Sequence, residues 1–297
     1  MANPQNYPNF MIVGAMKCAT STLHTQLMQQ PGIFMTDLKE PNFFSDDEEY
    51  AKGIDWYCSL FEGSEPALLR GESSTHYTKL PTYPKTIERI QQHCPDAKFI
   101  YVIRHPIDRL VSQYIHEWSQ RVISVEINQA IYQHSELIDY SRYTMQLQPY
   151  FEAFGKDRVL LIFFDNLLKS PQQELERVCQ FLDYPQQPEW QVEVGAQNAS
   201  NERLIKSKWR DALVETPGLR ELRQWLIPKS FRTWVRSLWT MKDRPQLTPE
   251  NVEYLREIFD RDLATLGSWL EIENLCCENF KEKAQQWKQP ISATSQH

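Results

Sequence analysis

Short apolar runs and amphipathic segments alternate along the first half of the chain. Nearly continuous hydrophobic runs, typical of strands that are buried on both faces, occur at 9–15, 67–72, 98–104 and 158–165. Segments with a helical spacing of apolar residues lie between them, at 22–30, 83–94 and 105–118. This alternation predicts an α/β fold, in which right-handed crossovers connect the strands of a central parallel sheet flanked by helices.

The segment 105–118 shows the clearest helical stripe. Its apolar residues recur at intervals of three and four, at Ile107, Leu110, Val111, Tyr114, Ile115 and Trp118. In the segment 83–94, Ile87 and Ile90 are three residues apart, and Pro84 lies near the start, where proline favours a helix. We therefore expect both segments to pack one apolar face against the core.

The pattern becomes mainly helical after the last apolar run. We expect a helix at 170–185, with Ser170 as its N-cap and Pro171 in its first turn. The polar stretch that follows is typical of a loop that reaches back over a site.

A final helix is expected at 248–267. Thr248 is in the N-cap position, Pro249 in the first helical position, and Gly267 in the place of a stop signal. The spacing of these three residues predicts both ends of the helix.

Composition indicates a globular protein with one sizeable core. The chain has 297 residues, of which 41% are hydrophobic and 24% charged. Because no internal repeat occurs, we expect one domain over 1–297, with an α/β core at 9–185 and a loop and helical C-terminal layer at 186–297. The net charge of −7 argues against nucleic acid as a partner, although a local basic patch can still bind a polyanionic substrate.

Targeting and redox features suit a cytoplasmic enzyme. The N-terminal residues lack the basic and apolar regions of a signal peptide, and no stretch approaches the roughly 20 apolar residues that span a bilayer. The six cysteines contain no CxxC motif and the seven histidines no HxxxH motif. We therefore expect reduced thiols rather than disulfides, and no metal site.

Residues 14–22, GAMKCATST, follow the first apolar run and precede a helix. One interpretation is a simple turn, with Thr20 or Ser21 as the N-cap of the helix. The other is an anion-binding loop, in which Lys17, hydroxyl groups and backbone amides surround a charged ligand. The GxxxxGK[ST] pattern of nucleotide triphosphatases is absent, because Lys17 comes three residues after Gly14.

A second candidate anion site follows the 98–104 run. Arg104 ends this run, at the edge where parallel sheets bind ligands, and Ser112 lies eight residues further on. No acidic residue that could bind Mg²⁺ occupies the end of the run. For Arg104 alone a structural salt bridge is the default interpretation, but together with the loop 14–22 an arginine fork and a hydroxyl favour a phosphate monoester.

These two motifs, GAMKCATST and VIRHPIDRLVSQY, resemble the 5′-phosphosulfate loop and the 3′-phosphate motif of sulfotransferases. Those enzymes use 3′-phosphoadenosine 5′-phosphosulfate (PAPS). KEPNFFSDD and KGIDWYCSLF are similar to segments of the carbohydrate sulfotransferases, notably the heparan sulfate N- and 3-O-sulfotransferases. GESSTHY lies where those enzymes have a Glu-Lys-Ser/Thr strand end. The resemblance covers roughly residues 9–185 and implies a P-loop-like three-layer fold.

The resemblance also implies roles for particular residues. Lys17 would lie against the bridging oxygen of PAPS, while Arg104 and Ser112 would bind its 3′-phosphate. The remaining expected donor-binding residues come from the phosphosulfate loop and from a segment that closes over the 3′-phosphate: Cys18, Ala19, Thr20, Ser21, Thr22 and Arg203. No metal is required.

Two residues are candidates for the base that takes the proton of the acceptor. Glu40 matches the base of the heparan sulfate enzymes and is favoured, while His76 is similar to the histidine of cytosolic sulfotransferases. Two departures from the family pattern stand out. Ala19 replaces a usual glycine, and Ser73 replaces a lysine common in the carbohydrate group.

The expected reaction is transfer of a sulfuryl group to a hydroxyl or amine of a saccharide or a small molecule. A P-loop nucleotide or small-molecule kinase and a non-catalytic sulfotransferase-like binding module remain alternatives. The basic, tryptophan-containing stretch 206–244 is interpreted either as a helix packed on the core or as a peripheral membrane contact. The acidic balance and the missing anchor suit a cytoplasmic, bacterial member.

Overall fold

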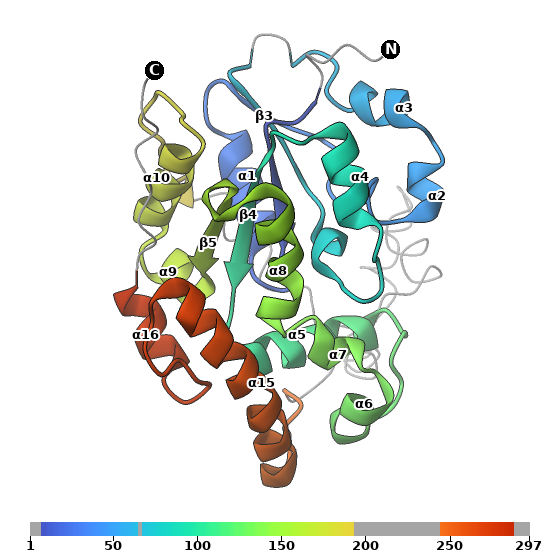
Figure 1. Ribbon diagram of the computed structural model, residues 1–297, viewed down its shortest axis with the longest axis vertical. Coiled ribbons are helices and arrows are strands. Elements are labelled where there is room, and N and C mark those ends of the chain that lie inside the picture. The colour runs from blue at the N-terminus through green and yellow to red at the C-terminus, as the bar shows by residue number, and fades with distance from the viewer. Residues whose placement is uncertain (1–6, 65–66, 193–243, 288–297) are drawn as a thin grey trace, which may run out of the picture.

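The computed structural model describes residues 7–64, 67–192 and 244–287 (Figure 1). Five parallel strands form one sheet in the order β2-β3-β1-β4-β5. They are β1 (Phe10–Gly14), β2 (Ile33–Met35), β3 (Leu69–Ser73), β4 (Lys98–Ile103) and β5 (Val159–Phe163). Four of the five match the apolar runs of the sequence. Because all strands run the same way, their carboxyl ends lie at one edge of the sheet.

Helices flank this sheet, and α8 crosses in front of it in Figure 1. The helices that follow β1 and β2 are α1 (Thr20–Met28), α2 (Asp47–Tyr50) and α3 (Ile54–Ser59), and those around β4 are α4 (Thr86–His93), α5 (Pro106–Ser119), α6 (Ile127–Gln133), α7 (Glu136–Asp139) and α8 (Tyr143–Phe154). The rest are α9 (Phe164–Lys169), α10 (Pro171–Phe181), α15 (Pro249–Leu270) and α16 (Phe280–Gln286), with 3₁₀ turns η2 (Thr75–Thr78) and η3 (Lys156–Arg158). The expected α/β class with a helical C-terminal layer is confirmed.

The core lies at the sheet and beneath the apolar stripe of α5. Every residue of β1 and β5 is buried, as are all but the first residue of β4. Four of the six expected stripe residues are buried, namely Leu110, Val111, Tyr114 and Ile115, and the other two are partly buried against the same core. This burial explains why the helical spacing was readable from the sequence.

Helix ends agree only in part with the expectations. The Thr248 hydroxyl accepts the expected capping bond from the amide of Asn251. Ser170 occupies the N-cap of α10 but makes no side-chain capping bond. The expected stop at Gly267 is wrong, because α15 continues to Leu270. A Cβ on Gly267 would lie 2.6 Å from the carbonyl oxygen of Ile272, so this glycine serves close packing of the chain that returns after the helix.

Some expectations concern residues outside the described ranges. Arg203 and nearly all of the basic stretch 206–244 belong to this group, so their proposed roles stay predictions. The last residue of that stretch, Arg244, pairs with Asp108 at the start of α5 at 3.0 Å. Within the described ranges, no helix combines the length and the apolar character needed to cross a bilayer.

Candidate functional site

Gly14 at the end of β1 allows the turn η2 to pack directly against the strand. The hydroxyl of Thr78 donates to the carbonyl of Val13 at 2.6 Å. A Cβ on Gly14 would lie 2.2 Å from the Thr78 oxygen and 2.8 Å from the ring of Tyr101, which is not possible without movement. The glycine therefore brings the turn that carries His76 next to the start of the loop 14–22.

The loop between β1 and α1 has an irregular backbone. Lys17 and Ala19 both adopt the left-handed conformation, with φ of 71° and 62°. Ala19 is the N-cap residue of α1, and no side chain caps the helix, so the interpretation of Thr20 or Ser21 as the cap is wrong. The left-handed backbone at Ala19 explains why related loops carry glycine there, because a Cβ costs about 1 kcal/mol in this conformation.

Arg104 connects the two motifs that the sequence separates. It follows β4, and its Nη1 donates to the carbonyl oxygen of Lys17 at 3.1 Å. The guanidinium lies over the ring of Phe164, 4.6 Å from its centroid. The hydroxyl of Tyr143 bonds the backbone amide and the carbonyl of Arg104, which fixes the end of the strand. Two segments that are 87 residues apart in sequence thus form one continuous surface at the carboxyl edge of the sheet.

Other residues near this edge have structural partners. Ser112 is half-buried on α5, two turns beyond Arg104. Burial raises the pKa of the Cys18 thiol to about 12, so the thiol stays protonated at neutral pH. His105 is the N-cap of α5, and its Nε2 bonds the carbonyl of Cys277 at 3.0 Å. His105 therefore anchors the C-terminal segment to α5.

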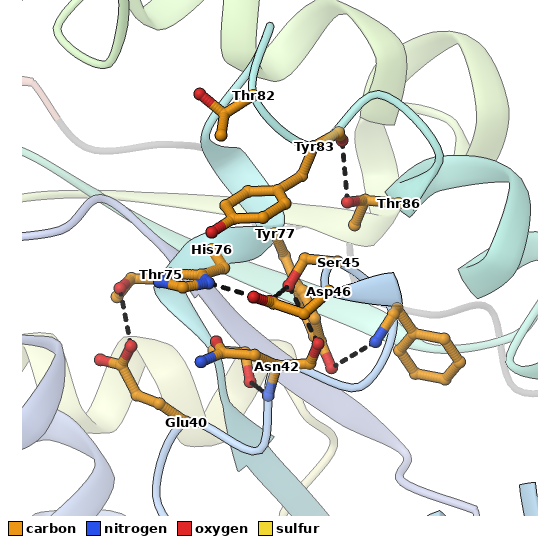
Figure 2. A network of polar contacts seen from close by, with 12 residues as sticks. Glu40, Asn42, Ser45, Asp46, Thr75, His76, Tyr77, Thr82, Tyr83 and Thr86 are labelled. Atoms are coloured by element: carbon orange, nitrogen blue, oxygen red, sulfur yellow. Dashed lines mark hydrogen bonds and ion pairs between the residues drawn. The ribbon is translucent and has the colours of Figure 1, made fainter. Parts of the chain in front are cut away.

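Glu40 lies beside the loop 14–22, held at three points. Its amide donates to the carbonyl of Ser73 at 2.9 Å. One carboxylate oxygen accepts the hydroxyl of Thr75 at 3.1 Å, as Figure 2 shows. The other pairs with Lys39 at 3.3 Å, and the same ammonium group donates to the hydroxyl of Ser21 at 2.5 Å. The ammonium group of Lys39 therefore links Glu40 to the first turn of α1.

His76 is held by a different set of partners. Its Nδ1 lies 3.0 Å from a carboxylate oxygen of Asp46, and its ring stacks on Tyr83 at 4.8 Å between centroids (Figure 2). Burial, followed by the nearby ammonium of Lys79, lowers the pKa of His76, while Asp46 opposes that shift. Asp46 and Tyr83 also line a cleft of about 370 Å³ between 45–49 and 82–85. His76 is thus oriented by segments other than the loop 14–22.

A buried carboxyl group that sequence reasoning missed supports the Glu40 loop. Glu72 near the end of β3 is fully buried, and burial raises its pKa to about 7. It accepts the hydroxyls of Tyr57 at 3.1 Å and Ser74 at 2.7 Å. The Ser74 oxygen in turn accepts the amide of Asn42 at 3.0 Å. In the sequence, the signal that could have revealed Glu72 was an acidic residue at the end of a buried strand. In the structure, its hydrogen bonds indicate that Glu72 positions the loop that carries Glu40.

The described ranges contain neither a cluster suited to a metal ion nor a disulfide. No group of three or more histidine, cysteine, aspartate or glutamate side chains there is placed to hold a metal ion. All six cysteines are unpaired, and five of them are buried. The site at the sheet edge is therefore built from cations, hydroxyls, amides and one carboxylate.

Comparisons with known proteins agree with this geometry. The profile of the sulfotransferase family matches residues 45–188. Heparan sulfate glucosamine 3-O-sulfotransferase 5 of Mus musculus is 28% identical over 198 residues, which cover 61% of this chain and 55% of that protein. The 3B1 enzyme of Mus musculus is 31% identical over 193 residues, covering 61% and 47%. A crystal structure of a sulfotransferase from Alicyclobacillus acidocaldarius aligns with a TM-score of 0.54 at 29% identity, over 63% of this chain and 88% of that one. Over the matched residues, the chain is therefore similar to sulfotransferases.

The sulfotransferase match has a defined extent. The family profile begins after the loop 14–22 and after Glu40, whereas it includes His76, Arg104 and Ser112. The chain spans about half the length of the curated relatives it matches. The roles of the individual residues therefore rest on their geometry and are treated as proposals.

Proposed function

We propose that the protein transfers the sulfuryl group of PAPS to a hydroxyl or an amine of an acceptor and releases adenosine 3′,5′-bisphosphate. The observation that carries this proposal is the bond from Arg104 to the carbonyl of Lys17 at 3.1 Å. It brings a phosphate-binding arginine and a lysine-containing loop to one edge of a parallel sheet, where such folds bind nucleotides. The similarity to sulfotransferases supports an enzyme of this class.

The residues of this edge fit a doubly phosphorylated nucleotide. Lys17 and the hydroxyls of Thr20, Ser21 and Thr22, with the first amides of α1, would bind the 5′ side, because a helix N-terminus favours an anion. Arg104 and Ser112 would bind the 3′-phosphate. Arg203, outside the described ranges, remains a proposed contact to the same phosphate. PAPS supplies an activated sulfuryl group, and these residues hold it in register with the acceptor.

Glu40 is proposed as the base. During transfer, the bond between sulfur and the bridging phosphate oxygen breaks, a bond forms between sulfur and the acceptor atom, and the acceptor proton moves to the Glu40 carboxylate. Lys17 would neutralise the charge that develops on the leaving phosphate. One ammonium group, that of Lys39, contacts both Glu40 and the first turn of α1, which supports Glu40 over His76. His76 is proposed to contact the acceptor.

A saccharide or a small molecule is proposed as the acceptor, and the named 3-O-sulfotransferase relatives support a saccharide. A cytoplasmic location is also proposed. It is supported by the six unpaired cysteines, because free thiols are typical of reducing compartments.

Thermal unfolding with different nucleotides tests the proposal. Adenosine 3′,5′-bisphosphate in the presence of EDTA should raise the Tm, and Mg·ATP should not, because the loop 14–22 lacks the triphosphatase pattern. Incubation with PAPS and a panel of saccharides and amines should then yield a sulfated product. Stabilisation by Mg·ATP alone would instead indicate a kinase. Nucleotide binding without transfer to any acceptor would indicate a binding module.

A further inference from the structure

Lys39 is not part of either motif, yet its ammonium group contacts both Ser21 of the first motif and Glu40. Its Nζ is 2.5 Å from the hydroxyl oxygen of Ser21 and 3.3 Å from a carboxylate oxygen of Glu40. An ammonium group has three donor hydrogens, so a third is available for another acceptor. Ser21 belongs to the hydroxyl cluster that is proposed to bind the 5′-phosphosulfate, so that acceptor would be an oxygen of the donor.

The neighbouring residues Ser73 and His24 carry no charge. Ser73 is fully buried, and its hydroxyl bonds Nδ1 of His24 at 2.9 Å. Burial and then the charge of Lys39 lower the pKa of His24 to about 4, so this imidazole is neutral at pH 7. Lys39 therefore brings a positive charge to this side of the loop 14–22, next to Ser21.

A purely structural role is the alternative for Lys39. The loop that carries it, however, is already attached to β3 by the bond between the Glu40 amide and the Ser73 carbonyl at 2.9 Å, and to η2 by Thr75. The side chains of Lys39 and Glu40 are both 31% exposed, and exposed ion pairs of this kind contribute little to folding. Contact with a bound ligand therefore explains the position of Lys39 better than a contribution to the stability of the fold.

We propose that Lys39 is a donor-binding residue that contacts the 5′-phosphosulfate group and at the same time positions Glu40 next to it. This inference rests on the proposed function and names a residue that neither motif contains. Because Lys39 contacts Ser21, which is proposed to bind the 5′ side, whereas Arg104 is proposed to bind the 3′-phosphate, Lys39 should act only on the 5′ side of the nucleotide. Removal of the Lys39 ammonium group should therefore weaken the binding of ligands that carry a 5′-phosphate and not of those that lack it.

Calorimetric titration of two ligands tests this proposal. The variants are Lys39→Met, which keeps the aliphatic stem, and Lys39→Arg, which keeps the charge. Lys52→Met is the matched control, because Lys52 is an exposed lysine that pairs with Glu49 on the adjoining segment. Each protein is titrated with adenosine 3′,5′-bisphosphate and with adenosine 3′-monophosphate, which lacks the 5′ group.

Lys39→Met should bind the bisphosphate about 10- to 100-fold more weakly, the loss expected for one charge-assisted hydrogen bond, and should bind the 3′-monophosphate within about twofold of wild type. Lys39→Arg should recover most of the loss, and Lys52→Met should leave both affinities unchanged. Equal affinities for the bisphosphate in wild type and Lys39→Met, or equal losses for both ligands, would overturn the proposal. A wild-type protein that binds neither ligand would instead refute the proposed function itself.

Discussion

The two halves of the candidate site are held in place by different kinds of interaction. The proposed donor half comprises residues 14–22, 39 and 104–112, and the proposed acceptor half comprises residues 40–46 and 75–78. The donor half depends on strand ends, left-handed backbone and one bond from Arg104 to a carbonyl oxygen. The acceptor half depends on side chains that contact one another across three segments, including the buried Glu72. Substitutions in the donor half should therefore act on the binding and activation of the donor, and substitutions in the acceptor half on proton transfer and on pH-dependent stability.

The largest effect is expected from Lys17→Ala in the donor half. The variant would lose the cation proposed to neutralise the leaving phosphate, so kcat should fall by about 10³-fold, the scale of removing a preorganised charge donor. Initial rates with PAPS and any acceptor found by screening measure this. Lys52→Ala is the control and should retain activity, because Lys52 is an exposed lysine that pairs with Glu49. A fall below tenfold for Lys17→Ala would remove Lys17 from the reaction centre.

The next largest effect concerns the choice of base in the acceptor half. Glu40→Gln should lower kcat by about 10²- to 10³-fold, as expected for loss of a general base, and leave bisphosphate binding within about threefold of wild type. His76→Gln should lower kcat by about tenfold or less, because Asp46 and Tyr83 hold its ring and His76 is proposed to contact the acceptor rather than to take its proton. Steady-state kinetics of the two variants decide the question. A larger loss in kcat for His76→Gln would transfer the role of base to His76.

Glu72 makes the stability of the acceptor half depend on pH. Its folded-state pKa of about 7 lies above the ordinary value of 4.5, so the folded state binds more protons than the unfolded state between these values. The free energy of unfolding should therefore fall as pH rises from 5 to 8, by about 2.5 kcal/mol from this group. Urea unfolding of wild type and Glu72→Gln at pH 5 and pH 8 measures the difference. The account predicts that Glu72→Gln lacks this fall; parallel pH profiles would contradict it.

The smallest effect is expected at Ala19 in the donor half. Ala19→Gly should relieve the left-handed backbone strain, which is worth about 1 kcal/mol, offset in part by the greater entropy of glycine in the unfolded state. The Tm should rise slightly, and bisphosphate affinity should not fall. Ser112→Gly provides a control, because Ser112 lies inside α5 and glycine there should lower the Tm. A marked loss of Tm for Ala19→Gly would show that the methyl group contributes packing.

The contrast between the two halves also explains which parts of the site could be predicted from the sequence. Arg104 and the loop 14–22 were predictable, because buried parallel strands produce apolar runs and their carboxyl ends meet at one edge. β2 was missed because its three residues are too short to form a recognisable run. The α1 cap was misassigned, since the left-handed conformation of Ala19 depends on the loop and not on local propensity.

The contacts of the acceptor half were not predictable in the same way. Glu40, His76 and their partners come from segments that the chain brings together only by folding. The resemblance to sulfotransferases pointed to Glu40 and His76, but nothing in the local sequence indicated that Asp46 would orient His76 and that Lys39 would contact Glu40. Such pairings depend on tertiary contacts that have no periodic signature in the sequence.

A co-crystal structure with adenosine 3′,5′-bisphosphate tests the central claim most directly. The account predicts a single bound nucleotide, with its 5′-phosphate on residues 17–22 and its 3′-phosphate on Arg104 and Ser112. A nucleotide bound elsewhere, or one that reaches only one of these two segments, would contradict the claim that together they form the site for the sulfuryl donor.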